Sequence, residues 1–210
     1  KELEKYNYQD VTRALRSVPG IKAYTEDGYG NRPNIGLRGG KSERSTGITL
    51  MEDGILIAPA PYAAPSAYYF PKMERMAEIE VLRGPSAIKA GPITTSGAIN
   101  LKTKPIADKT GGYASFQVGS NNSNKTNVNL NIKEEKFAAM LNMNRSTTDG
   151  YKNLDGGGNT GFEINDFVGK FRYIPDPSAS KYQHFEVKLG LNDEVSRETY
   201  LDLTDADFQA

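Results

Sequence analysis

The sequence predicts an α+β unit in residues 1–105, followed by a run of antiparallel β-strands in residues 106–210. Two observations lead to this prediction. The first half combines one helical stripe of apolar residues with short strands that are separated by glycine- and proline-containing turns. The second half replaces this pattern with alternation of apolar and polar residues over long segments. The change of pattern places the boundary between Lys104 and Gly112.

Composition excludes several classes of protein. Lys and Arg together number 26, as do Asp and Glu, so the formal net charge is zero. A chain without net charge lacks the basic field that binds nucleic acid. The chain has no cysteine, which excludes a disulfide framework and a thiolate metal site. No apolar stretch reaches the length that a transmembrane helix needs.

The first half is predicted to begin with a helix. Asn7 and Asp10 form a possible capping pair, and Pro19 with Gly20 ends the helix. The apolar stripe consists of Val11, Ala14, Leu15 and Val18.

A hairpin, two strands and a short helix are predicted to follow. Asp53-Gly54 favours the tight turn of a hairpin. The predicted elements are hairpin strands at Gly47–Met51 and Ile55–Ile57, a strand at Ile79–Leu82, a short helix from Gly84 through Ile88 that Gly91 closes, and a last strand at Ala98–Thr103.

The second half is predicted to contain about five strands, several of them about as long as the roughly 10 residues that span a membrane. Their ranges are 112–118, 125–133, 136–147, 162–174 and 182–195. The alternation breaks near Asn165, which predicts a β-bulge. A short turn at Glu134–Lys136 and a long connection at Asp149–Gly161 suit an outer-membrane barrel. Alternation alone favours a soluble antiparallel sandwich over a barrel, and it is the first half of the chain that changes this balance.

Four motifs give the first half a family resemblance. They are DVTRALRSVPG at Asp10–Gly20, NIGLRG at Asn34–Gly39, ITLMEDGILI at Ile48–Ile57, and the block Met73–Lys104 that contains IEVLRGPS and GAINLKTK. In this order and spacing they resemble the plug domain of TonB-dependent outer-membrane receptors. The stretch Ala58–Pro65 is most similar to receptors of the ferric-citrate type.

The resemblance implies a transporter of the Gram-negative outer membrane. In that family a barrel of about 22 strands surrounds the plug, and this chain is expected to hold only the first barrel strands, in contact with outer-membrane lipid. TonB would pull a motif that lies upstream of Lys1. The resemblance implies neither enzymatic chemistry nor a resident cofactor, and nucleic acid is not an expected partner.

Site residues follow from the resemblance and from side-chain chemistry. Ligand contacts are expected from Arg44, Ser45, Thr46, Tyr62, Tyr68 and Tyr69, with Arg32 as a further cation. The aromatic residues could equally pack the plug against the barrel wall. Arg38 and Arg83 resemble the arginines that lock the plug to carboxylates of the barrel, and the alternative is two ordinary surface arginines.

The expected cargo is a ferric chelate that arrives already complete, so no metal ligands are expected from the protein. Cobalamin, a nickel complex or an oligosaccharide is the alternative cargo, and a soluble carbohydrate-binding β-protein is the alternative class. Gly39–Ser42 is a poor phosphate loop because no helix start follows it. His184, the only histidine, falls on the polar face of a strand and has no triad motif around it.

Overall fold

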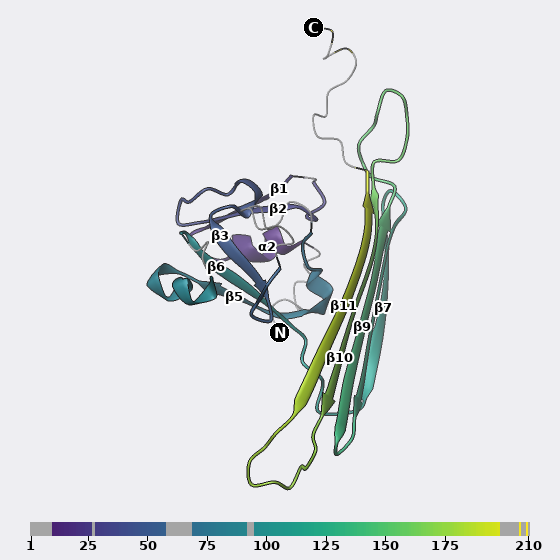
Figure 1. Cartoon of the computed structure of the whole chain (residues 1–210). Coiled ribbons are helices and arrows are strands. Elements are labelled where there is room, and N and C mark those ends of the chain that lie inside the picture. Colours follow the sequence, from purple (N-terminus) through teal and green to yellow (C-terminus); the bar gives the residue numbers. More distant parts are fainter. Residues whose placement is uncertain are drawn as a thin grey trace. The chain divides into compact units, whose positions relative to one another are not determined.

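A computed structural model of the chain describes residues 10–26, 28–57, 69–91 and 95–197, together with Ala206 and Gln209. The chain divides into two compact units, Lys1–Lys104 and Pro105–Ala210, here called unit 1 and unit 2. Figure 1 shows unit 1 as a set of short elements and unit 2 as one sheet of long strands.

The described residues of unit 1 form two sheets. β1 and β2 pair as an antiparallel ribbon, and a second sheet has the order β4-β3-β6-β5, in which β3 and β6 run parallel. The elements are α2 (Val11–Arg16), β1 (Ile21–Thr25), β2 (Pro33–Leu37), the 3₁₀ turn η1 (Glu43–Ser45), β3 (Ile48–Glu52), β4 (Ile55–Leu56), the 3₁₀ turn η2 (Met73–Arg75), β5 (Met76–Leu82), the 3₁₀ helix η3 (Gly84–Ala90) and β6 (Gly97–Thr103).

Local chemistry explains where these elements begin and end. Asp10 caps α2, because its carboxylate accepts from the Thr12 amide at 2.7 Å and from the Thr12 hydroxyl at 2.6 Å. Asn7, the other predicted cap residue, lies outside the described residues. Asp53 and Gly54 both have positive φ, 51° and 81°, which is the backbone of the predicted hairpin turn between β3 and β4.

One apolar core joins the elements of unit 1. It takes Leu15 from α2, Ile35 and Leu37 from β2, and Leu50 and Ile99 from β3 and β6, all of them at most 1% exposed. Both sheets and α2 therefore contribute to the same main core, and a smaller cluster of Met51, Ala87 and Ala98 packs η3 against β3 and β6. Glycines permit the close packing beside it: a Cβ on Gly40 would lie 2.0 Å from the Ser96 hydroxyl oxygen.

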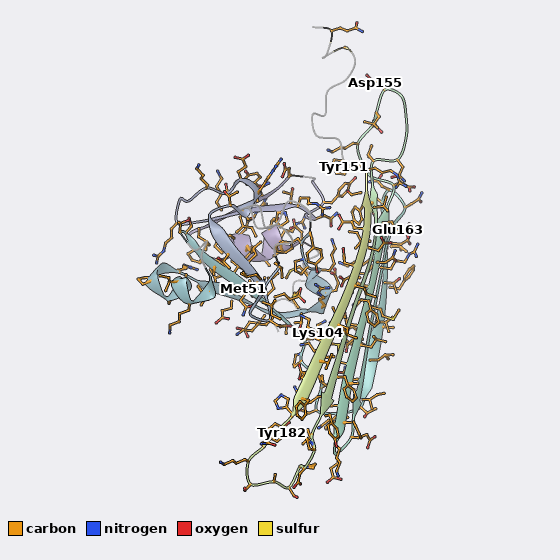
Figure 2. All side chains as sticks on the ribbon, in the orientation of Figure 1. Met51, Lys104, Tyr151, Asp155, Glu163 and Tyr182 are labelled. Atoms are coloured by element: carbon orange, nitrogen blue, oxygen red, sulfur yellow. The ribbon has the colours of Figure 1, made fainter. Side chains whose placement is uncertain are left out.

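Unit 2 is a single antiparallel sheet with the order β11-β10-β9-β8-β7 (Figure 1). Its strands are β7 (Gly111–Gly119), β8 (Ser123–Lys133), β9 (Phe137–Thr148), β10 (Phe162–Tyr173) and β11 (Phe185–Ser196). The short turn between β8 and β9 and the long connection between β9 and β10 lie where the sequence predicts them. Tyr151 and Asp155 mark the long connection at one end of the sheet, and Tyr182 lies at the other end (Figure 2).

The predicted bulge near Asn165 is wrong. Asn165 pairs with Arg145 of β9 and with Asp193 of β11, and the register of β10 runs without interruption from Phe162 to Tyr173 on both sides. The alternation looks broken because Ile164 and Val168 are apolar residues on the face that also carries Asp166 and Lys170. The phase is constant, and the side chains on that face are mixed.

The two faces of this sheet differ in polarity. One face exposes large apolar side chains, including Leu189 at 66% and Leu191 at 73%. The other buries amides, and Asn144 links Asn127, Asn142 and Asp166 through side-chain hydrogen bonds. No helix among the described residues combines the length and the apolar character that crossing a membrane requires. The predicted fold class, an α+β unit followed by antiparallel strands, is confirmed.

Candidate functional site

The turn η1 is fastened to the start of β2. The Ser45 hydroxyl accepts from the Ile35 amide at 3.0 Å and donates to the Pro33 carbonyl at 3.1 Å. The Arg44 amide donates to the Asn34 side-chain oxygen. Arg44 and Ser45 both adopt left-handed backbone, with φ of 47° and 57°. These hydrogen bonds hold a conformation that L-residues otherwise avoid.

This fastening assigns different roles to three predicted ligand residues. Ser45 is fully buried, and its hydroxyl is used within the turn. Arg44 is exposed, and among the described residues its guanidinium has no hydrogen-bond or ion-pair partner. Thr46 is half-buried and ends the turn, because its backbone amide donates a hydrogen bond to the Glu43 carbonyl at 3.0 Å. Arg44 and Thr46 are therefore the members of the predicted trio that a ligand can reach.

Two further cations lie at the same end of β2. The Lys72 ammonium donates to the Asn31 side-chain oxygen at 3.0 Å, and the Arg32 guanidinium donates to the Asn31 carbonyl at 3.1 Å. We call Arg32, Arg44, Thr46 and Lys72 the β2 cluster. Sequence reasoning missed Lys72, because nothing in the spacing of Lys72 and Asn31 indicates that they meet.

Of the predicted tyrosines, Tyr69 is described and Tyr62 and Tyr68 lie outside the described residues. The Tyr69 hydroxyl accepts a hydrogen bond from the Arg75 guanidinium, which also forms a salt bridge with Glu52 at 2.6 Å. Arg75 and Glu52 are 3% and 7% exposed. The Tyr69 hydroxyl is therefore hydrogen-bonded to a buried ion pair that joins η2 to β3.

The structure places the side chain of one predicted lock arginine, Arg38, beside the residue that follows the other, Arg83. Arg38 is exposed, has a φ of 52°, and donates its amide to the Gly20 carbonyl at 2.9 Å. A Cβ on Gly84 would lie 3.6 Å from a guanidinium nitrogen of Arg38, so the Arg38 side chain reaches the residue next to Arg83. Arg83 itself is half-buried at the start of η3.

A separate charged cluster lies on β5 and β6. The Asn100 amide donates to the Glu80 carboxylate at 3.2 Å and, with the Lys102 ammonium 3.4 Å away, lowers the pKa of Glu80. The Glu78 carboxylate, 3.1 Å from the Lys102 ammonium, raises the pKa of Lys102 together with Glu80. Within the described part of the chain, no group of three His, Cys, Asp or Glu side chains could hold a metal ion.

Comparison with known sequences connects this arrangement to one domain family. Residues 1–98 match the model of the TonB-dependent receptor plug domain. The chain is 29% identical over 119 residues to a vitamin B12 transporter of Vibrio vulnificus, and 31% identical over 115 residues to an iron-regulated outer-membrane virulence protein of Vibrio cholerae. These matches cover 57% and 50% of this chain, but only 19% and 16% of the relatives.

Solved structures share the fold of both units. The ferric citrate transporter FecA aligns with a TM-score of 0.71 and 24% identity over 89% of this chain and 29% of its own. The ferric yersiniabactin receptor FyuA of Yersinia pestis aligns with a TM-score of 0.70 and 20% identity over 91% of this chain and 30% of its own. The copper transporter OprC gives a TM-score of 0.68 at 19% identity over 90% of this chain and 29% of its own. These relatives are receptors and transporters.

Proposed function

Residues 1–98 belong to the plug domain family of TonB-dependent receptors, and from this premise we propose that the chain is part of a receptor that imports a ferric chelate across the outer membrane of a Gram-negative bacterium. TonB is the proposed energy-coupling partner. The plug and the strands of unit 2 would act with the remainder of the receptor, since this chain spans less than a fifth of the curated relatives cited above.

The β2 cluster is the observation that favours an anionic cargo. Arg44 exposes a guanidinium without a partner among the described residues, and Arg32 and Lys72 add positive charge at the same end of β2. Ferric chelates are commonly anionic, and a hydrogen bond to a charged group contributes about 1.5–3 kcal/mol. The name of the Vibrio cholerae relative, an iron-regulated protein, points in the same direction.

A second cargo is favoured by a different observation. The Vibrio vulnificus relative is a vitamin B12 transporter, at nearly the same identity. Cobalamin would depend less on the β2 cluster, because it presents a large apolar and amide-rich surface rather than a compact anion. A nickel complex or an oligosaccharide would use the same transport machinery. The match of residues 1–98 to the plug domain of TonB-dependent receptors speaks against the alternative of a soluble carbohydrate-binding protein.

Uptake by the complete receptor tests the proposal. Labelled ferric citrate, a ferric catecholate, cobalamin, a nickel chelate and an oligosaccharide are offered to cells with and without energised TonB. We expect saturable, TonB-dependent uptake of a ferric chelate. Uptake of cobalamin or a sugar, with no response to any ferric chelate, would overturn the proposed cargo and leave the transporter class intact.

Arg44 gives the sharpest residue-level test of an anionic cargo. Arg44→Ala should weaken binding of the transported ferric chelate about tenfold or more, because one charged hydrogen bond is lost. Arg13→Ala is the matched control, since Arg13 is an exposed arginine on α2 and removes the same charge from the same unit. Equal affinities of the two variants, measured by titration of the purified receptor, would remove Arg44 from the site.

A further inference from the structure

A buried charged residue, Arg75, contacts the predicted ligand residue Tyr69. The Arg75 guanidinium donates from the same terminal nitrogen to the Glu52 carboxylate and to the Tyr69 hydroxyl. A buried ion pair is retained only where its geometry is good, because desolvation otherwise exceeds the attraction between the charges. Here the pair joins the central strand β3 to η2, and it contacts a half-buried tyrosine.

The frame that carries Arg75 is fixed from several sides. The Lys104 amide donates to the Arg75 carbonyl at 2.8 Å, and the Lys104 ammonium donates to the Glu74 carbonyl at 2.7 Å. Phe70 and Met73, on either side of Lys72, are buried in the apolar core. The backbone from Phe70 to Arg75 is therefore anchored, and the guanidinium sits at a defined place on it.

Lys72 links this frame to the β2 cluster. Its ammonium reaches Asn31, whose carbonyl also receives the Arg32 guanidinium. Tyr69 lies three positions before Lys72 on the same anchored segment. Because Tyr69 and Lys72 share this segment, a contact that orients the Tyr69 side chain also fixes its position relative to the cations of the β2 cluster.

We infer that Arg75 is a positioning residue for ligand binding: paired with Glu52, it holds the Tyr69 hydroxyl, so that Tyr69 offers the ligand its ring rather than its hydroxyl. The inference rests on the proposed function of the β2 cluster and Tyr69 as the ligand face. A preorganised aromatic wall loses less conformational freedom on binding than a rotating one, and this raises affinity. Arg75 acts through Tyr69 and does not touch the ligand.

The first experiment observes Tyr69 without any ligand. 3-Fluorotyrosine is placed at position 69 of the full receptor, and its ¹⁹F resonance is compared with that of the same label at the exposed Tyr24. The test variant is Glu52→Met/Arg75→Met, which removes both charges together and leaves no stranded ion. We expect the position-69 resonance to shift and narrow towards the Tyr24 resonance. An unchanged resonance would overturn the inference, whatever the cargo is.

The second experiment is a double-mutant cycle on ligand affinity with ferric citrate as the probe, or the ferric catecholate if citrate does not bind. Tyr69→Phe and Glu52→Met/Arg75→Met should each weaken binding about three- to tenfold, the equivalent of one ordinary hydrogen bond. The combined variant should lose no more affinity than the weaker-binding of the two, because both changes remove the same hydrogen bond between Arg75 and Tyr69. Additive losses would mean that the pair only stabilises the plug, and would overturn the inference. If neither chelate binds, the proposed cargo fails, and the ¹⁹F shift still decides whether Arg75 and Glu52 fix the Tyr69 side chain.

Discussion

Left-handed backbone at residues other than glycine costs roughly 1–2 kcal/mol for each residue. Four residues of unit 1 other than glycine adopt this backbone, Arg38, Arg44, Ser45 and the hairpin residue Asp53, and the sequence had already suggested the first three for function. Strain of this kind persists where the surroundings over-determine the backbone. Asn34 and the two hydrogen bonds of the Ser45 hydroxyl do so for η1, and the Gly20 carbonyl does so for Arg38.

The lock proposed for Arg38 and Arg83 leads to a prediction about permeability. Both guanidinium groups are expected to meet carboxylates of the complete receptor, and removing one member of a buried pair costs about 3–5 kcal/mol. Arg38→Ala/Arg83→Ala should therefore loosen the plug, leave membrane insertion intact and admit large antibiotics. Growth inhibition by such antibiotics is the measurement.

A control for this double variant must remove the same charge elsewhere in unit 1. Arg13→Ala/Lys89→Ala does so at two exposed positions on α2 and η3. The lock is refuted if both double variants leave antibiotic sensitivity and transport at the level of the parent receptor.

At the level of elements, sequence reasoning succeeded for strands that a regular alternation of apolar and polar residues marks along the chain. The strand predicted at 136–147 is Phe137–Thr148 in the structure, and that predicted at 182–195 is Phe185–Ser196. Alternation identifies such strands because each side chain reports one face. The bulge prediction failed because it rests on alternation as the only guide to the faces of the strand. Ile164 and Val168 are apolar residues on a mostly polar face, and they made a regular strand look interrupted.

Pairing between distant segments left no signal in the sequence. The strand β1 was not predicted at all, and neither was the parallel pairing of β3 with β6 across the chain. The Glu52–Arg75 pair and the Asn31–Lys72 contact likewise join segments that are far apart in the sequence. The exposed arginine of the β2 cluster could be anticipated from residue type, whereas the burial of Ser45 and the support behind Tyr69 could not.

The contact between β5 and β6 makes a pH prediction. The hydrogen bond from Asn100 lowers the pKa of Glu80 below its ordinary value of 4.5. The ionised carboxylate of Glu80 therefore stabilises the folded state. This stabilisation is present above pH 4.5 and is lost as the pH falls through the lower folded-state pKa. Glu80→Gln should therefore lower the melting temperature of the receptor slightly at neutral pH and not in acid.

Glu43→Gln is the matched control for this titration, because Glu43 is an exposed carboxylate on η1. The effect of Glu80→Gln should shrink in high salt, as expected for a solvent-exposed charge. A melting-temperature difference between Glu80→Gln and the parent that persists unchanged after the pH has fallen below the folded-state pKa of Glu80 would contradict the assignment.

For the whole molecule, the polarity of the unit 2 sheet determines what surroundings the chain needs. Its apolar face exposes Phe185 at 68% and Leu191 at 73%, and the neighbouring strands present Phe171 and Met143 on the same face. An apolar face of this extent marks a surface that contacts lipid or protein. Among the described strands, β7 and β11 each pair on one side only, so both leave backbone donors and acceptors open.

Unit 1 differs because most of its large apolar side chains are buried in one main core and a smaller cluster beside η3. We therefore expect residues 1–105, expressed alone, to be soluble and mostly monomeric in plain buffer. Residues 1–210 should aggregate there, because the apolar face and the open edges of unit 2 find no partner. Size-exclusion chromatography with light scattering, run with and without a mild detergent, measures the difference. Detergent should restore a small species only for 1–210, and a clean monomer of 1–210 in plain buffer would count against a membrane-spanning role for these strands.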